Sequence, residues 1–431
     1  MADRNPEPPL SNQPPHPVVN WQRTDYSRVP FWLYHDPAIY QREQERIFRG
    51  PTWSYVGLEC EFPNPGDFRT TFIGETPVIV NRGRDGAIHV LVNRCGHRGA
   101  LVRREARGNA KEHICIYHRW CFDLDGSLLG LPFRHGLKGK GGMGADFDMA
   151  EHGLKRLNVA SRAGVIFASF RADAEPLEAY IGPTIIAHID RIFGKPIRVL
   201  GYQRQRIYGN WKLYLENQRD TYHGSLLHDF QSTFGISRAT QVGGVRMDER
   251  HRHNLTWAKT GTDDDAEFGS IYKDNKIHDS RLRLLDPSMV QFRREYDDGI
   301  SLAICGIFPN TTIHQISNSL ATRQLRTFGP GEFELLWTLF GYADDSEAMT
   351  QHRLVQANMV GPAGLISMED GEAIEITQRA VVGDKDGCSV IEMGGRGPIK
   401  NLDHRINDMP VRGFWSYYAE LMGLEPEGAE R

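Results

Sequence analysis

The stretch CGHRGALVRREARGNAKEHICIYHRW, residues 95–120, decides how this chain is interpreted. It contains two Cys–His pairs, Cys95 with His97 and Cys115 with His118, in the pattern C-x-H-x17-C-x2-H. Each pair follows a strand-like run and leads into a loop, so two finger-like loops can face each other. The pairs are either unrelated buried residues, a structural zinc site, or ligands of a [2Fe–2S] cluster with two thiolates on one iron and two imidazoles on the other. The order of the residues favours the cluster, because zinc sites more often use C-x2-C and H-x3–5-H spacings.

The composition is that of an ordinary globular protein. A chain of 431 residues is too long for one hydrophobic core, so we expect at least two domains. The net charge of −4 gives no sign of a nucleic-acid-binding surface. No apolar run approaches the roughly 20 residues that span a bilayer, and the N-terminus lacks a secretion signal. We therefore expect a cytoplasmic protein without membrane or nucleic-acid partners, whose six cysteines stay reduced.

The pattern of apolar residues changes near residue 170. Residues 1–20 are rich in proline, which predicts a disordered tail. Residues 49–170 contain short β-branched runs separated by Gly/Asp turns, which predict a small all-β domain. Beyond residue 170, long strands over 300–343 and helices over 178–194, 210–228 and 345–380 predict an α+β arrangement, an antiparallel sheet flanked by helices.

A second candidate metal site lies in ENQRDTYHGSLLH, residues 216–228. On a helix, Asp220 and His223 share one face, whereas His228 points elsewhere. Gly224 could loosen the turn and let both imidazoles converge. Two histidines and one carboxylate are typical of non-haem Fe(II) oxygenases, although an amphipathic helix with solvated polar residues would give a similar pattern.

Both motifs resemble those of one family. Residues 93–120 are similar to the Rieske domain of aromatic ring-hydroxylating oxygenase large (alpha) subunits, and residues 216–228 fill the family pattern E-N-x-x-D-x-x-H-x4-H without gaps. Further matches are SRVPFWLY (27–34), PGDFRTTFIGETP (65–77), GYQRQRI (201–207), IEMGG (391–395) and VRGFW (411–415). Across the chain, the resemblance is closest to the anthranilate, salicylate and terephthalate oxygenase group.

The resemblance implies the two cofactors and their ligands. A Rieske [2Fe–2S] cluster would be held by Cys95, His97, Cys115 and His118, and a mononuclear Fe(II) by His223, His228 and a distant carboxylate. The stretch GPAGLISMEDGEAIE, residues 361–375, supplies that carboxylate, and the match selects Asp370. Glu369 and Glu372 are alternative ligands, and Asp370 could instead be a capping-box acid after Ser367.

The resemblance also implies how electrons reach the mononuclear iron. In the family, the residue at the position of Asp220 bridges a Rieske histidine of one subunit to an iron-binding histidine of the next. Here that path would join His118 of one chain to His223 of its neighbour, which requires a trimer of large subunits.

An aromatic carboxylic acid is the substrate that the resemblance implies. Arg323, in the strand-like run HQISNSLATRQL (314–325), matches an arginine that binds the carboxylate in terephthalate-type members, and Arg405 is a second candidate. The GKGGMG stretch at 139–144 lacks a flanking βαβ unit, so we expect no dinucleotide site there. The chain would then need a separate NADH reductase, with or without a ferredoxin, and its closest groups usually add a small beta subunit.

The predicted protein is the terminal oxygenase large subunit that mono- or dihydroxylates an aromatic acid with O2. Its expected domains are a Rieske domain over 49–170 and a catalytic domain of the helix-grip, Bet v 1-like type over 171–431, to which residues 21–48 add an N-terminal helical part. A Rieske monooxygenase that removes O- or N-methyl groups and a non-catalytic zinc-binding protein are the alternatives.

Overall fold

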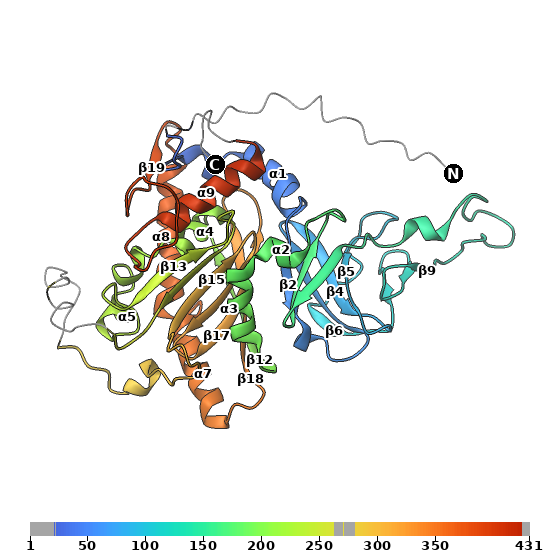
Figure 1. Cartoon of the computed structure of the whole chain (residues 1–431). Coiled ribbons are helices and arrows are strands. Elements are labelled where there is room, and N and C mark those ends of the chain that lie inside the picture. The colour runs from blue at the N-terminus through green and yellow to red at the C-terminus, as the bar shows by residue number, and fades with distance from the viewer. Residues whose placement is uncertain (1–20, 22, 263–269, 271–280, 425–431) are drawn as a thin grey trace.

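The computed structural model describes residues 21, 23–262, 270 and 281–424, and the predicted tail at residues 1–20 lies outside them. The molecule is elongated, with a large sheet flanked by helices at one end and several small sheets at the other (Figure 1). This confirms the predicted α+β class. Within the described residues, no helix combines the length and the apolar character needed to cross a membrane.

The small sheets form the β-rich end of the molecule. They are a four-stranded sheet in the order β5-β4-β3-β6 and two three-stranded sheets, β7-β8-β9 and β10-β11-β2. Branched residues in β4 and β5 favour strands, and Gly86, with φ of 82°, closes the turn between them. The strands are β2 (Ser54–Leu58), β3 (Asp67–Ile73), β4 (Thr76–Arg82), β5 (Ile88–Val92), β6 (Arg107–Asn109), β7 (His113–Ile114), β8 (Cys121–Phe122), β9 (Leu128–Gly130), β10 (Asn158–Arg162) and β11 (Val165–Ser169).

The large sheet is antiparallel throughout and has the strand order β12-β18-β17-β16-β15-β14-β13. The run 314–325, expected as one strand, is instead a hairpin that turns at Ser317 (φ 53°) and Asn318. The strands are β12 (Ile197–Ile207), β13 (Gly243–Met247), β14 (Asn254–Ala258), β15 (Leu302–Ile307), β16 (Thr311–Ile316), β17 (Ser319–Thr327) and β18 (Phe333–Tyr342).

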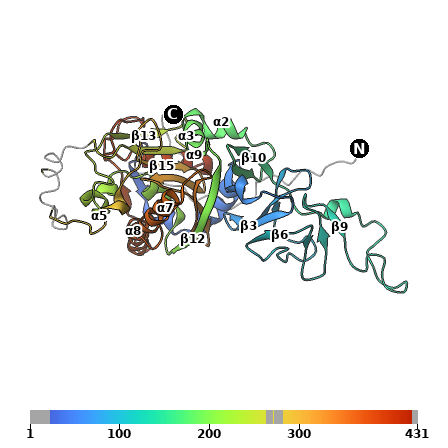
Figure 2. The ribbon, with the colours of Figure 1, turned by 90° about the horizontal axis from the view of Figure 1, so that it is seen from below.

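Helices cover both faces of this sheet (Figure 2). On one face, apolar residues of α2 (Leu177–Ile181) and α3 (Pro183–Phe193) pack against alternate strand residues such as Cys305 and Ile313. The other face packs with α4 (Trp211–Arg219), α7 (Glu347–Val360), α8 (Leu365–Val381) and α9 (Met409–Met422). The helix expected over 178–194 is broken at Gly182, whose φ of 76° no helix interior allows.

The N-terminal segment joins the C-terminal half of the chain. Strand β1 (Arg28–Pro30) pairs with β19 (Cys388–Val390), and α1 (Pro37–Glu43) continues into a π-turn that contacts α9. The remaining short elements are α5 (Asp229–Thr233) and the single turns η1 (Phe31–Tyr34), η2 (Gln44–Phe48), η3 (Glu59–Glu61), η4 (Met149–His152), η5 (His223–Ser225) and η6 (Pro287–Val290).

A buried ion pair fixes α4 to this segment. Lys212 Nζ lies 2.6 Å from Glu43 Oε1, and both side chains are fully buried. The Glu43 carboxylate also accepts hydrogen bonds from Trp211 Nε1 at 2.7 Å and Tyr418 OH at 2.6 Å. Three helices, α1, α4 and α9, therefore meet at one carboxylate.

Replacing Lys212 by Met should destabilise the protein by about 3–5 kcal/mol, because it leaves Glu43 charged, buried and without its cation. Urea unfolding followed by tryptophan fluorescence measures the loss. The double variant Glu43→Gln/Lys212→Met should recover much of it, and Arg171→Met at the exposed Arg171–Asp173 pair should change nothing measurable. A wild-type unfolding curve for Lys212→Met would show that the pair does not stabilise the fold.

Candidate metal centres

The two Cys–His loops have the same backbone geometry. In the first, the N–H of Cys95 donates to Ala100 O and that of Gly99 to Cys95 O, both at 2.9 Å. In the second, Cys115 N–H donates to Trp120 O at 2.9 Å and Arg119 N–H to Cys115 O at 3.0 Å. The fifth residue of each loop, Gly99 or Arg119, has a positive φ, 74° and 57° respectively. Two equivalent loops thus present a thiol and an imidazole each.

The four side chains converge as a bridged cluster requires. Cys95 and Cys115 are buried, and burial together with the neighbouring Cys115 thiol raises the pKa of Cys95. The rings of His97 and His118 lie 4.4 Å apart between centroids, and Trp120 stacks on His97. Among the described residues, the loops do not bring three ligand atoms within 4.8 Å of one another, as a single zinc ion would need. The arrangement fits a two-iron cluster better than structural zinc.

The second motif does not form the continuous helix predicted over 210–228. Helix α4 ends at Arg219, because Asp220 leaves the helical conformation and its Oδ1 accepts from Tyr222 N–H at 2.7 Å. A single turn, η5, then carries His223, and His228 is the residue that immediately precedes α5. This break, rather than a loosened helix at Gly224, brings the two imidazoles to a centroid distance of 5.3 Å.

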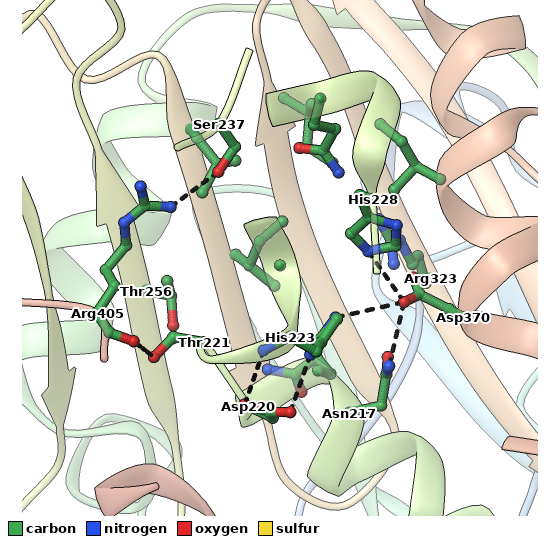
Figure 3. Close-up of a pocket in the computed structure, with 17 residues that line it drawn as sticks. Asn217, Asp220, Thr221, His223, His228, Ser237, Thr256, Arg323, Asp370 and Arg405 are labelled. Atoms are coloured by element: carbon green, nitrogen blue, oxygen red, sulfur yellow. Dashed lines mark hydrogen bonds and ion pairs between the residues drawn. The ribbon is translucent and has the colours of Figure 1, made fainter. Parts of the chain in front are cut away.

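His223, His228 and Asp370 form one cluster (Figure 3). Asp370 Oδ1 lies 3.4 Å from His223 Nε2 and 3.2 Å from His228 Nε2. Each of the three residues offers one ligand atom, and these atoms all lie within 4.8 Å of one another. Within the described part of the chain, no other set of three His, Cys, Asp or Glu residues does so. Two imidazoles and a carboxylate, on one side of a cavity, suit an iron ion with open positions.

The structure separates Asp370 from its alternatives. Helix α8 begins at Leu365, so Asp370 lies in its second turn and contacts imidazoles instead of capping the helix. Glu369 Oε2 lies 2.7 Å from His228 Nδ1, the ring nitrogen that faces away from the cluster. Glu372 is exposed. Glu369 therefore orients a candidate ligand, and Glu372 contacts none of the three.

Each imidazole is held by a second carboxylate. Asp220 Oδ2 lies 3.1 Å from His223 Nδ1, and Glu369 Oε2 lies 2.7 Å from His228 Nδ1. These contacts place the proton of each ring on Nδ1 and leave Nε2 to face the cluster. Asn217 Nδ2 also donates to Asp370 Oδ1 at 3.1 Å. The sequence motif contained Asn217, but its contact with Asp370 depends on the packing of α4 against α8.

The cluster is a region of negative potential. Burial acts to lower the pKa of His223, but hydrogen bonds with Asp220 and Asp370 outweigh burial and raise it to about 10. Burial likewise acts to raise the pKa of Asp370, yet the two histidines hold it below its usual range. A positive charge is therefore strongly favoured at this point, as a metal ion would supply.

The cavity beside this cluster holds both arginines proposed from the sequence. Arg323 lies on the side of His228 and Asp370, and Arg405 lies across the cavity beside Ser237 (Figure 3). Arg405 donates to Ser237 Oγ at 2.8 Å and to a backbone carbonyl. The remaining wall combines the aliphatic side chains of Leu302, Ile304, Ile316 and Ile366 with polar ones such as Gln218, Gln231 and Thr256.

Arg323 is buried, and none of the described acidic residues forms an ion pair with it. Its side chain is on β17, 5% exposed, and its Nε donates to His314 Nδ1 at 3.0 Å. Within the described residues no carboxylate forms an ion pair with it. Because a buried cation without a counter-charge is unfavourable, this arginine is suited to bind an anion in the cavity.

The Cys–His loops are far from this cavity within one chain. Strand β9, which shares a three-stranded sheet with β7 and β8 beside the second loop, lies at the end of the molecule opposite α8 (Figures 1 and 2). Asp220, by contrast, lines a hollow on the surface of the catalytic half. The structure therefore brings the four loop residues together, and the three cluster residues together, but not the two sets.

The chain is similar over most of its length to several oxygenase subunits. The chain is 49% identical over 409 residues to the large subunit of anthranilate 1,2-dioxygenase from Burkholderia cepacia, covering 94% of this chain and 96% of that protein. It is 45% identical to the large oxygenase component of salicylate 5-hydroxylase from Ralstonia sp., with 94% and 96% covered. It is 44% identical to the terminal oxygenase component subunit alpha 2 of terephthalate 1,2-dioxygenase from Comamonas sp., with 95% and 98% covered.

The fold is also shared with a solved structure. Naphthalene 1,2-dioxygenase from Rhodococcus sp., bound to indole, superposes with a TM-score of 0.75 at 24% identity, over 92% of this chain and 94% of that one. Two family models match as well, a Rieske [2Fe–2S] domain over residues 52–139 and the catalytic domain of a ring-hydroxylating alpha subunit over residues 196–423. The resemblance found in the sequence is thereby confirmed: the chain belongs to the ring-hydroxylating oxygenases as a large (alpha) subunit, an oxidoreductase with a Rieske [2Fe–2S] cluster and a mononuclear catalytic iron.

Proposed function

We propose that this enzyme hydroxylates the ring of an aromatic carboxylic acid. The observation that carries the proposal is the buried Arg323, which lines the same cavity as His223, His228 and Asp370 and has no acidic partner among the residues that the structure describes. Relatives that are 44–49% identical over most of their length are named for their action on anthranilate, terephthalate and salicylate, which are all aromatic acids.

His223, His228 and Asp370 are the proposed ligands of the mononuclear iron, and Cys95, His97, Cys115 and His118 those of the cluster. When bound, the two centres supply the electrons and the activation of O2 that hydroxylation needs. The chain's own residues do the rest. Asp220 and Glu369 fix the ring orientation of the two histidines, and Asn217 holds the Asp370 carboxylate.

The cavity would orient the substrate by binding its carboxylate at one end and its aromatic ring at the other. Arginine offers paired N–H groups that match a carboxylate, and in a buried site such a pair is protected from water. The aliphatic wall formed by Leu302, Ile304, Ile316 and Ile366 would hold the ring. With its carboxylate on Arg323, the ring is presented to the iron ligands on the same side of the cavity.

Electrons would cross from one subunit to the next, in a trimer of large subunits. Asp220 contacts His223 and lines a hollow that also contains Glu216, Glu392 and Asp408. The tips of the Cys–His loops carry the opposite charge, with exposed arginines at 94, 98 and 119, and exposed apolar side chains at Ile116 and Tyr117. An acidic hollow and a cationic tip are complementary, so His118 of one subunit would dock against Asp220 of its neighbour.

Other proteins complete the system. Oxygenases of this family receive their electrons from a separate reductase, with or without a ferredoxin. We propose an NADH-dependent reductase, a cytoplasmic location and a small beta subunit, since the relatives are named as large or alpha subunits.

Replacing Arg323 by Met should lower kcat/KM for aromatic acids roughly 100-fold, because hydrogen bonds to a charged group contribute about 1.5–3 kcal/mol. The wild type, supplied with a reductase, is first tested on anthranilate, salicylate, terephthalate and benzoate, with 18O2 to identify ring-hydroxylated products. Arg326→Met is the control, because Arg326 lies on the same strand and stacks on Phe328. If no acid is hydroxylated, or if Arg323→Met is as active as the wild type, the proposal is wrong.

Glu369→Gln should weaken Fe(II) binding about 10–100-fold, because it removes the charge that orients His228. Chelator competition measures the affinity without any turnover. The control is Glu372→Gln, which changes an exposed residue two positions after Asp370 on the same helix. This variant should bind iron as tightly as the wild type. Equal iron affinities for the two variants would contradict the proposed role of Glu369 in orienting His228.

A mixed oligomer tests the path between subunits. Chains with Cys115→Ser lack a cluster ligand and chains with His223→Ala lack an iron ligand, so each should be inactive alone. Co-expression with two affinity tags should yield mixed oligomers that regain measurable activity, because a complete path forms at some interfaces. Co-expression of two differently tagged Cys115→Ser chains is the control. Inactive mixed oligomers would indicate transfer within one chain.

A further inference from the structure

A histidine lies directly behind the substrate-facing arginine. His314 is on β16, fully buried, and its Nδ1 accepts the hydrogen bond from Arg323 Nε at 3.0 Å. The register of the sheet places them together: Arg323 pairs with Thr312, and His314 lies two residues further along β16. Both side chains therefore project from the face of the sheet that borders the cavity.

The ring of His314 acts as an acceptor. Because Arg323 Nε can only donate, Nδ1 must be unprotonated and the ring proton lies on Nε2. Burial and the adjacent Arg323 both lower the pKa of His314 well below its usual range. A neutral ring can approach the guanidinium without repulsion, whereas an imidazolium could not accept this bond.

Trp337 restrains the arginine from another side. It is the residue directly opposite Arg323 on β18, and its ring lies 4.1 Å from the guanidinium carbon. The aromatic face restricts the plane of the guanidinium, and the bond to His314 restricts rotation within that plane. Among the described residues, neither terminal nitrogen of Arg323 has a hydrogen-bond partner, so both remain for a ligand.

We infer that His314 is a positioning residue that turns Arg323 so that its two terminal nitrogens, and not Nε, bind the substrate carboxylate. The inference rests on the proposed function, in which Arg323 recognises an acid. Without His314, the guanidinium could rotate, its Nε would lack a partner, and the paired N–H groups would no longer be held toward the cavity. His314 is thus a determinant of specificity for acids, although it does not line the cavity itself.

Two amide substitutions separate this role from simple packing. In His314→Asn, the side-chain oxygen takes the place of Nδ1 and can accept from Arg323. In His314→Gln, the oxygen extends to the place of Nε2 and cannot. Both variants are neutral and polar, so they differ mainly in whether the acceptor is restored. His314→Leu removes it altogether.

The readout is the preference for benzoate over benzamide, which share a ring and differ in charge. Equilibrium dialysis with the full-length oxygenase measures both affinities. The wild type should prefer benzoate at least about tenfold, given the strength of charge-assisted bonds. His314→Asn should retain this preference within about threefold, whereas His314→Gln and His314→Leu should lose most of it while binding benzamide as before. Melting temperature and iron content show whether each variant is folded.

Each outcome bears on one claim. If the wild type does not distinguish benzoate from benzamide, recognition of an acid by Arg323 is wrong, and the role of His314 is wrong with it. If the wild type and Arg323→Met differ as expected but His314→Gln keeps the full preference, the proposed function stands and the role of His314 is overturned. A loss of preference in His314→Asn equal to that in His314→Gln would also overturn it, because the restored acceptor would have had no effect.

Discussion

One carboxylate oxygen, Oδ1 of Asp370, is the point on which the catalytic half depends. It faces the Nε2 atoms of His223 and His228 and accepts a hydrogen bond from Asn217. These partners come from α4 and the turns that follow it, whereas Asp370 comes from α8. A buried carboxylate needs compensating partners. The packing of α4 against α8 supplies some of them, and a cation bound where the two helices meet would supply the rest, so helix packing and cation binding stabilise each other.

The two histidines have similar supports but different surroundings. Each donates its Nδ1 proton to a second carboxylate, Asp220 or Glu369. Asp220 lines an acidic hollow on the surface, whereas Glu369 does not. The carboxylate–imidazole contact therefore orients the ring of both histidines. At His223 it also connects the buried cluster with the surface where a neighbouring subunit would dock.

The large sheet gives the cavity its precision. Arg323, His314 and Trp337 project from adjacent strands whose register is fixed by continuous hydrogen-bonded pairing. Side chains placed on strands are held more exactly than side chains on loops. On the opposite face of the sheet, α3 packs against a layer of apolar strand residues, which excludes water from that face. Apolar packing on one face of the sheet thus stabilises the strands that carry the buried Arg323 on the other face.

The sequence by itself determined the family, the α+β class and both cofactors, because the Cys–His loops and the segment 216–228 are contiguous and their spacing carries the ligand pattern. It did not reveal that α4 ends at Arg219, that 314–325 is a hairpin, or that Arg323 and Arg405, offered as alternatives, line one cavity. Nor did it distinguish Glu369 as a partner of His228 from Glu369 as a ligand. Those features were decided only by the tertiary structure, because spacing within a loop is imposed by covalent connectivity, whereas contacts between distant segments depend on how the sheet and its helices pack.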